Sequence, residues 1–292
     1  MAHKAGFINI IGRPNVGKST LMNQLMGEKF SIVTHKAQTT RHRIMGIING
    51  EDFQIVYSDT PGIISPRYEL QNIMMNYVLE SLEDADLILF VTDIYEKHNE
   101  KEIIQMLEKT TVPIVVLINK IDTATQPDVM AKIKYWEETL SPTAVIPISA
   151  LHKFNLESVM HIILEKLPEH PPYFPKDEIT NRSERFFASE FIREKLFKYL
   201  EQEVPYCCQV EIISFKESQD LIRIHAEIIV ERESQKGIVI GKHGDMLKKI
   251  GTEARKDMEK FFGKKIFLEQ YVKVEPNWRK DKRKLRLFGY GT

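Results

Sequence analysis

The sequence predicts an α/β protein in which a doubly wound, mostly parallel sheet with one antiparallel edge strand precedes a smaller α+β domain. Three observations predict this fold class. Short apolar runs rich in β-branched residues alternate with helix-length segments between residues 6 and 167, as parallel strands and crossover helices do. A proline-rich stretch follows. Beyond it, periodic segments come in the order helix, strand, strand, helix, turn, helix, strand.

Five apolar runs of the first region are expected to be its parallel strands. They read FINIIG, FQIVYSD, DLILFVTD, PIVVLINK and TAVIPISA. An additional strand over 43–48 is joined to 53–58 through Asn49-Gly50, a strong signal for a tight hairpin. This hairpin predicts the antiparallel edge of the sheet.

Residues 167–178, LPEHPPYFPKDE, hold four prolines and predict a linker or a packed connector. The smaller domain should then contain a helix over 185–200 and alternating strands over 208–215 and 221–230. A short helix ending at Ile240, a second over about 244–262 and a last strand over 265–274 complete it. The strand over 221–230 should be half-buried, because apolar residues occupy alternate positions. These are Ile222, Ile224, Ala226, Ile228 and Val230.

Composition limits the classes of protein that this chain can be. No apolar run reaches eighteen residues and the N-terminus shows no cleavage pattern, so we expect a cytosolic protein. Cys207 and Cys208 are adjacent, which suits reduced structural residues better than a disulfide or a metal site. Residues 236–292 carry 16 Lys and Arg against 7 Asp and Glu, a candidate surface for a polyanion.

A phosphate-binding loop is predicted where GRPNVGKST joins the first strand to a helix. The pattern G-x-x-x-x-G-K-[ST] lets backbone N–H groups and the helix dipole receive phosphate. Lys18 can reach the β- and γ-phosphates, and Ser19 can ligate Mg²⁺. The predicted nucleotide contacts of this loop are Gly12, Arg13, Pro14, Asn15, Val16, Gly17, Lys18, Ser19 and Thr20.

Two later segments select guanine. In Asn119-Lys120-Ile121-Asp122, the Asp122 carboxylate can accept hydrogen bonds from guanine N1–H and the exocyclic amino group, whereas adenine would leave it unpaired. Ser149, Ala150 and Leu151 follow the last strand and would place backbone N–H groups near the guanine oxygen.

A nucleotide-dependent switch is expected on either side of the hairpin. In Asp59-Thr60-Pro61-Gly62, Asp59 can hold Mg²⁺ through water, and the Gly62 N–H can meet the γ-phosphate. Before the hairpin, in THKAQTTRHR, a threonine hydroxyl can complete the magnesium shell. Both Thr39 and Thr40 qualify, with Thr40 preferred.

Taken together, GRPNVGKST, AQTTRHR, DTPG, NKID and SAL resemble the motif set of the Era family of GTPases, in the TrmE-Era-EngA class. The resemblance implies a Ras-like P-loop domain that binds and slowly hydrolyses GTP with Mg²⁺. Ile63 stands where Ras-like enzymes use a glutamine to orient the attacking water, so another group must do this. Asn15 stands where related potassium-activated GTPases place a K⁺ ligand, which makes K⁺ a candidate cofactor; a simple turn-capping role is equally open.

The second glycine-rich turn, in GIVIGKHGDMLKKIG, resembles the KH RNA-binding module of type II. In that module a G-x-x-G turn presses its backbone against about four single-stranded nucleotides. A helix-turn-helix without a ligand is the plainer alternative. Ile228 is a further candidate for the groove wall. The predicted RNA contacts of this region are Ile238, Ile240, Gly241, Lys242, His243, Gly244, Lys248 and Lys249.

The tail NWRKDKRKLRLFGYG interleaves aromatic and basic residues, and similar endings in the Era family take part in RNA recognition. Trp278 and Arg279 are therefore added to the expected RNA contacts. A basic helix lying on an anionic membrane surface is the competing interpretation.

The expected organisation is a GTP-binding domain over 1–170, a linker over 171–180 and a KH domain with a basic tail over 181–292. The resemblance implies binding to the 3′ end of 16S ribosomal RNA and a role in maturation of the small ribosomal subunit. We expect a monomeric, cytoplasmic protein with at most weak peripheral association with the membrane. The alternatives are a membrane-associated signalling GTPase and a non-catalytic RNA-binding scaffold.

Overall fold

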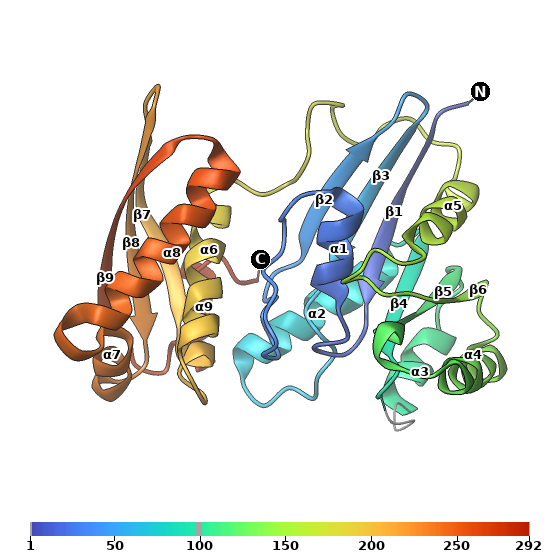
Figure 1. Ribbon diagram of the computed structural model, residues 1–292, viewed down its shortest axis with the longest axis horizontal. Helices are drawn as coiled ribbons and strands as arrows, with labels where there is room; N and C mark the ends of the chain where they lie inside the picture. Colours follow the sequence, from blue (N-terminus) through green and yellow to red (C-terminus); the bar gives the residue numbers. More distant parts are fainter. Residues whose placement is uncertain (1, 97–100, 292) are drawn as a thin grey trace. The chain divides into compact units, whose positions relative to one another are not determined.

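The structure, a computed structural model, describes residues 2–96 and 101–291 (Figure 1). The chain forms two compact units. The first consists of Met1–Ser31, Thr40–Ser65 and Met74–Asn181, and the second of Ile32–Thr39, Pro66–Ile73 and Arg182–Thr292. Two short segments from the first quarter of the sequence therefore belong to the compact unit of the C-terminal domain.

The first unit contains a six-stranded sheet in the order β2-β3-β1-β4-β5-β6. All neighbouring strands are parallel except β2 and β3, which confirms the predicted antiparallel edge. Its strands are β1 (Lys4–Ile11), β2 (Ile44–Asn49), β3 (Phe53–Asp59), β4 (Leu87–Asp93), β5 (Ile114–Asn119) and β6 (Ala144–Pro147).

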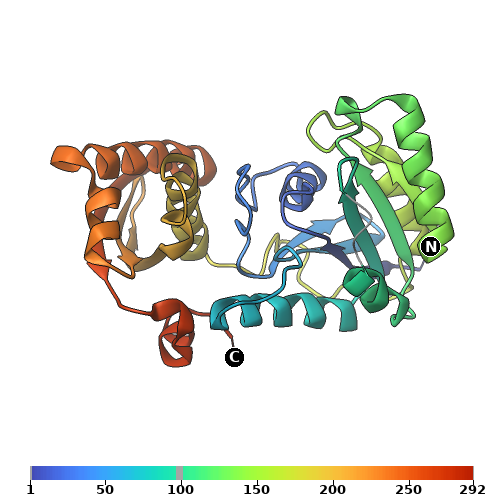
Figure 2. The ribbon, with the colours of Figure 1, turned by 90° about the horizontal axis from the view of Figure 1, so that it is seen from below.

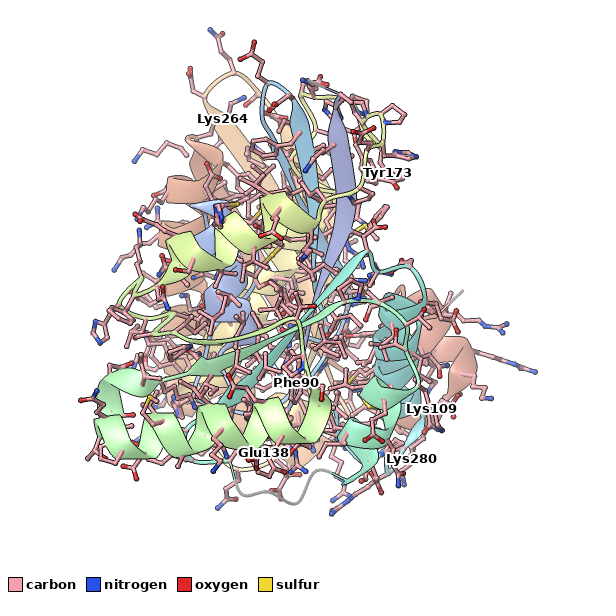
Figure 3. All side chains as sticks on the ribbon, turned by 90° about the vertical axis from the view of Figure 1, so that its right-hand side faces the viewer. Phe90, Lys109, Glu138, Tyr173, Lys264 and Lys280 are labelled. Carbon is pink, nitrogen blue, oxygen red and sulfur yellow. The ribbon has the colours of Figure 1, made fainter. Side chains whose placement is uncertain are left out.

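Helices lie on both faces of this sheet (Figures 1 and 2). One buried apolar cluster packs α1 and α5 on the sheet, and another packs α3 and α4 on the other face. In the second cluster, Phe90 of β4 meets Trp136 of α4 edge-on, with ring centroids 5.2 Å apart. Figure 3 labels Phe90 among the side chains of this unit. The helices are α1 (Lys18–Met26), α2 (Glu69–Glu83), α3 (Lys101–Glu108), α4 (Gln126–Leu140) and α5 (Leu156–Lys166).

The proline-rich stretch packs against the hairpin of the first unit. The buried Gln54 side chain accepts hydrogen bonds from the backbone N–H groups of Tyr173 (2.7 Å) and Phe174 (3.0 Å), and it donates one to the Phe174 carbonyl. Thr180 pairs with Gly46 of β2. Of the two interpretations of this stretch, the packed connector is the one observed.

The second unit contains a three-stranded sheet in the order β7-β8-β9, with β7 antiparallel and β9 parallel to β8. Alternate residues of β8 from Ile222 to Val230 are buried, as predicted. The elements follow the expected order, and their bounds differ from the predicted ones by at most two residues. They are α6 (Glu184–Tyr199), β7 (Gln209–Glu217), β8 (Leu221–Val230), α7 (Glu233–Ile240), α8 (Asp245–Phe262), β9 (Lys265–Val274) and the tail helix α9 (Lys282–Leu287).

Two predictions from composition can be compared with the structure. Cys207 and Cys208 are both buried, and neither is part of a disulfide among the described residues. Within residues 2–96 and 101–291, the structure has no helix of the length and hydropathy that crossing a membrane requires.

Candidate functional site

The loop after β1 owes its shape to residues with positive φ. Gly12 has φ 149°, Asn15 has φ 66° and Gly17 has φ 102°. A Cβ atom on Gly12 would clash with the Val91 carbonyl, and one on Gly17 would clash with the Asn119 amide. Only glycine fits at positions 12 and 17. The loop therefore brings the N–H groups at the start of α1 together as an anion site.

Lys18 is the first residue of α1 and is almost completely buried. Its Nζ donates to the Arg13 carbonyl at 2.7 Å, so the side chain lies across the loop. Burial lowers the pKa of this ammonium to about 8, while the Asp59 and Glu96 carboxylates act in the opposite direction. A polyphosphate in the loop would add negative charge and favour the protonated form.

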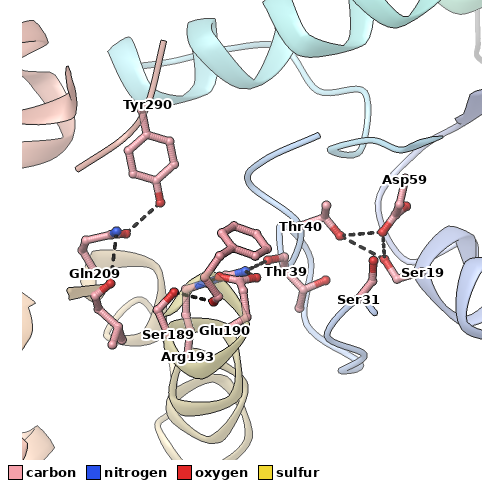
Figure 4. A network of polar contacts seen from close by, with 12 residues as sticks. Ser19, Ser31, Thr39, Thr40, Asp59, Ser189, Glu190, Arg193, Gln209 and Tyr290 are labelled. Atoms are coloured by element: carbon pink, nitrogen blue, oxygen red, sulfur yellow. Dashed lines mark hydrogen bonds and ion pairs between the residues drawn. The ribbon is translucent and has the colours of Figure 1, made fainter. Parts of the chain in front are cut away.

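Three oxygen-bearing side chains converge beside the loop (Figure 4). Ser19 Oγ donates to Asp59 Oδ2 at 2.8 Å, and Thr40 Oγ1 lies 2.9 Å from Ser19 Oγ and 3.3 Å from Asp59 Oδ2. Burial raises the pKa of Asp59, and its Oδ1 accepts no hydrogen bond from the described residues. Hydroxyl and carboxylate oxygens are ligands that Mg²⁺ prefers, so a buried carboxylate oxygen without a donor fits this cation.

The turn that contains Gly62 lies directly on the phosphate-binding loop. A Cβ atom on Gly62 would lie 2.6 Å from the Pro14 nitrogen, and the Ile63 N–H donates to the Gly12 carbonyl at 3.0 Å. Thr60 is anchored through its hydroxyl to the Ile10 carbonyl at 2.8 Å. The Ile63 side chain packs against the apolar cluster beneath α3 and α4, so it cannot orient a water molecule.

Asn119 connects the predicted base-recognition segments to the phosphate-binding loop. Its Nδ2 donates to the Val16 carbonyl at 2.8 Å, and its Oδ1 accepts from the Ala150 N–H at 2.9 Å. Both polar atoms of this amide are thus used to hold two loops together. Ser149 supports the second loop by exchanging backbone hydrogen bonds with Phe154.

Lys120 and Asp122 follow Asn119 at the end of β5. Lys120 has φ 66°, and its Nζ pairs with Asp93 at 2.7 Å. The Asp122 side chain is 27% exposed and lies 3.8 Å from His152 Nε2, so its carboxylate is accessible to a base. Leu151 is exposed on the neighbouring loop. Asp93 was not singled out in the sequence, although its position after an apolar run of β4 was a usable signal.

The second glycine-rich turn, at residues 241–244, is more exposed to solvent than the phosphate-binding loop. Gly241, His243 and Gly244 all have positive φ, and a Cβ atom on Gly241 would lie 2.7 Å from Met246 Cβ. Lys242 and His243 are exposed between the two glycines. The turn therefore presents its backbone and two basic side chains to solvent, at the start of α8.

Four other predicted RNA contacts surround this turn. Ile238 is 50% exposed and Ile240 is partly buried. Lys248 is exposed on α8, and the exposed Lys249 places its Nζ 4.3 Å from the centre of the Tyr199 ring. These side chains are accessible to a ligand.

Trp278, Arg279 and Ile228 do not fit their predicted roles. Trp278 is fully buried, and its Nε1 donates to the Cys207 carbonyl at 3.0 Å. Arg279 bonds Glu231 and stacks over the Tyr68 ring at 4.9 Å. Ile228 is fully buried in the domain core. An aromatic residue in a basic segment suggested a stacking platform for bases, but the tail folds back onto its own domain and its indole has no exposed face.

Comparisons with known proteins agree with this arrangement. Residues 7–120 match the family model of a 50S ribosome-binding GTPase, and residues 203–279 match the KH domain model. The chain is 46% identical over 290 residues to the GTPase Era of Clostridium kluyveri, covering 98% of this chain and 99% of that protein. It is 44% identical over 289 residues to the GTPase Era of Clostridium acetobutylicum, covering 98% of each.

Two solved structures match over 99% of this chain and 100% of theirs, each with a TM-score of 0.95 and 41% identity. One is Era in complex with MgGDPNP and nucleotides 1506–1542 of 16S ribosomal RNA. The other is a variant of Aquifex aeolicus Era bound to GDP and AlF₄⁻. With relatives of such identity along nearly its whole length, the chain belongs to the Era family of GTPases, and it combines the family's P-loop GTPase domain with a KH domain.

Proposed function

We propose that this GTPase binds the 3′ end of 16S ribosomal RNA and acts in the assembly of the small ribosomal subunit. The observation that carries the proposal is the presence, in one chain, of a glycine-shaped loop beside the converging Ser19, Thr40 and Asp59 side chains and of an exposed Gly241–Gly244 turn. The related Era structure that holds both MgGDPNP and 16S RNA supports it. We assign residues 1–170 to the GTPase domain, 171–180 to the connector and 181–292 to the KH domain with its tail.

The GTP site of the proposal uses the converging residues described above. Lys18 would bind the β- and γ-phosphates, and the Gly62 N–H would meet the γ-phosphate. Ser19, Thr40 and Asp59 would hold Mg²⁺, directly or through water, with Thr40 assigned instead of Thr39 because its hydroxyl lies 2.9 Å from Ser19 Oγ. Asp122 would read guanine, with Asn119 and Ala150 supporting its loop.

The RNA site would be the open turn and its neighbours. Backbone N–H groups of the turn would approach phosphates, and Lys242 and His243 would supply charge and hydrogen bonds. Ile238 and Ile240 would form an apolar wall for bases, with Lys248 and Lys249 nearby. Trp278 and Arg279 are left out, because both are engaged within their own compact unit.

Asn15 supports a second cation in the proposal. Its positive φ of 66° and its exposed position in the phosphate-binding loop suit a ligand that faces the nucleotide. If K⁺ binds there, GTP turnover should be faster in potassium than in sodium buffer of equal ionic strength, and Asn15→Ala should remove the difference. Equal turnover of the unaltered protein in both buffers would exclude this role.

The RNA assignment is tested with a synthetic single-stranded RNA carrying the 3′-terminal 16S sequence. Its affinity is compared with that of a scrambled RNA of the same composition at fixed salt, because phosphate contacts alone are strongly salt-dependent. We expect at least about tenfold tighter binding of the 16S sequence, which is the order of discrimination that a few base contacts provide. Equal binding of the two RNAs would overturn the 16S assignment, and no binding of either RNA would overturn the RNA-binding role proposed for the Gly241–Gly244 turn.

A peripheral role at the membrane receives less support. The tail helix α9 spans only Lys282–Leu287, and its Leu285 is buried against the protein, leaving Leu287 as its exposed apolar residue. We propose a cytoplasmic location. Binding to anionic vesicles that persists when Lys242 and His243 are replaced would favour the membrane role.

A further inference from the structure

The three-stranded sheet of the second unit has one face in the domain core and one face that carries exposed aromatic residues. Alternate residues of β8 from Ile222 to Val230 are buried in the core. The intervening positions, with their partners on β7 and β9, form the other face. On this second face Phe267 is 46% exposed and Tyr271 is 55% exposed. Large exposed aromatic side chains on one face of a sheet mark a candidate binding surface.

Three side chains form one row across this face. Lys216 of β7 is in register with Arg223 of β8, which is in register with Phe267 of β9. Residues in register on neighbouring strands place their side chains on the same face of a sheet. Arg223 Cζ lies 5.3 Å from the centre of the Phe267 ring. The row therefore holds a guanidinium group and an aromatic ring against each other, with a lysine beside them.

Three cations lie at this end of the face. Two belong to the row, and Lys265 lies two residues before Phe267 on the same strand and face. Lys264, next to it, pairs with Glu217 at 2.6 Å. Within residues 2–96 and 101–291, none of the three cations of this face forms an ion pair with a carboxylate. They are therefore available to bind phosphate.

The rest of the exposed face is acidic. Glu269 lies in the next row, and Glu211 and Glu227 are in register with each other in the row after that. Burial raises the pKa of Glu211, and the Glu227 carboxylate acts in the same direction. Tyr271 is in register with Glu227 and so belongs to this acidic part. Phosphate is repelled there, which limits a contact with a polyanion to the basic row.

The basic row is separate from the Gly241–Gly244 turn. α8 begins directly after the turn, and its 18 residues span about 27 Å along the helix axis before β9 begins. Phe267 is the third residue of β9. A strand of about four nucleotides, as a KH turn holds, therefore leaves the row vacant.

We propose that Lys216, Arg223 and Phe267 form a second contact for single-stranded RNA, on the exposed face of the sheet. The proposal rests on the RNA-binding function proposed above for the turn. Bases stack on exposed aromatic rings and on guanidinium planes, and lysines bind the flanking phosphates. One stacked base is a weak ligand by itself, so the row adds affinity only for an RNA that the turn already holds and that is long enough to reach it.

The test compares two RNAs at one salt concentration with the full chain. The short RNA carries the 16S 3′-end sequence alone. The long RNA adds unstructured oligouridine extensions of about 15 nucleotides on each side, which let a second segment reach the sheet. We expect the long RNA to bind the unaltered protein roughly tenfold more tightly, an increment that one stacked base provides. Equal affinities for the two RNAs would overturn the second contact.

Phe267→Leu removes the ring and keeps an apolar side chain. It should lower the affinity for the long RNA roughly fivefold and leave that for the short RNA within about twofold, so the ratio of the two affinities falls. Tyr271→Leu is the matched control, because Tyr271 is exposed on the same strand and face but lies beside Glu227. Its ratio should equal that of the unaltered protein. An equal fall of the ratio in both variants would overturn the assignment to the basic row.

Arg223→Lys distinguishes stacking from charge alone. It keeps the positive charge but loses the planar guanidinium, so it should lower the ratio in the same direction as Phe267→Leu. If the pair of Arg223 and Phe267 only stabilises the sheet, both variants lower the thermal stability or both RNA affinities, and the ratio is unchanged. If the face binds a protein partner instead, both RNA affinities are unchanged. Either result overturns the second RNA contact.

The short RNA separates failure of this inference from failure of the proposed function. If the short RNA binds and the ratio does not respond to Phe267→Leu, the second contact is overturned and the role of the Gly241–Gly244 turn stands. If neither RNA binds the unaltered protein, both the second contact and the RNA-binding role of the turn are overturned.

Discussion

The two glycine-rich turns of this chain, the phosphate-binding loop and the KH turn, differ in how closely the surrounding protein encloses them. In the phosphate-binding loop, glycine is required by close packing, since a Cβ atom on Gly12 or Gly17 would clash with neighbouring chain segments, and Lys18 is buried. In the KH turn, the space beside Gly244 is open and Lys242 is exposed. An enclosed site suits a small ligand that reacts, because buried charges act strongly in a poorly hydrated site. An open turn suits a long strand that must enter from the side.

The largest expected effect comes from removing the buried cation of the enclosed site. Lys18→Ala should lower the rate of GTP hydrolysis by at least about 100-fold, the order of loss seen when one preorganised electrostatic group is removed. Phosphate release under saturating GTP measures it. RNA affinity without nucleotide should stay unchanged, and a parallel loss of RNA binding would show that the two sites are not independent.

Replacing Asp122, the residue expected to select guanine, should have almost as large an effect on GTP affinity. Asp122→Asn removes the carboxylate that would accept from the N1–H and amino group of guanine, so GTP affinity should fall by about 100-fold, as unpaired buried groups predict. Xanthosine triphosphate carries a carbonyl oxygen in place of that amino group and should bind the variant better than GTP. Unchanged preference for GTP would contradict the role of Asp122.

A smaller effect, on the free energy of unfolding, tests whether Trp278 belongs to the domain core and not to the RNA site. Trp278→Phe loses the hydrogen bond to the Cys207 carbonyl and part of a fully buried ring, which should lower the free energy of unfolding by about 1–3 kcal/mol. Denaturant titration measures this change. Below the unfolding transition, RNA affinity should remain within about twofold. A large loss of RNA affinity without loss of stability would restore Trp278 to the RNA site.

The smallest expected effect is on RNA affinity, when either glycine of the open turn is replaced by alanine. Both have positive φ, but only Gly241 lies against a neighbour, with Met246 Cβ 2.7 Å from the position of an added Cβ. Gly244→Ala should therefore cost only the backbone strain of about 1 kcal/mol, or roughly a fivefold loss of RNA affinity. Gly241→Ala should be clearly worse in the same assay. Equal losses would mean that the packing against Met246 is unimportant.

The fold was predictable because its signals are local. Alternation of apolar residues identified β8, and Asn49-Gly50 identified the antiparallel hairpin. Four of the five motifs lie at the carboxyl ends of β1, β3, β5 and β6, where parallel topology brings them together regardless of intervening sequence, whereas AQTTRHR precedes the antiparallel strand β2.

Other features could not be predicted, because they depend on contacts between segments far apart in the sequence. One is the way in which both polar atoms of the Asn119 amide hold two loops together. The buried pair of Arg193 and Glu190 resembles an ordinary surface pair at helical spacing, and the attachment of residues 32–39 to α6 has no sequence signal. The burial of Trp278 likewise follows from the path of the tail, which composition does not reveal.

The most direct test of the central claim, two separate phosphate-binding turns with separate ligands, is one titration of a double variant. Lys242→Asp with His243→Asp should abolish binding of the 16S 3′-end RNA while GTP affinity stays within about twofold, because charge at an exposed turn acts locally at physiological salt. Lys256→Asp with Lys260→Asp places the same number of acidic residues at exposed positions further along α8 and is the control for general electrostatic loss. RNA affinity equal to that of this control would contradict the account.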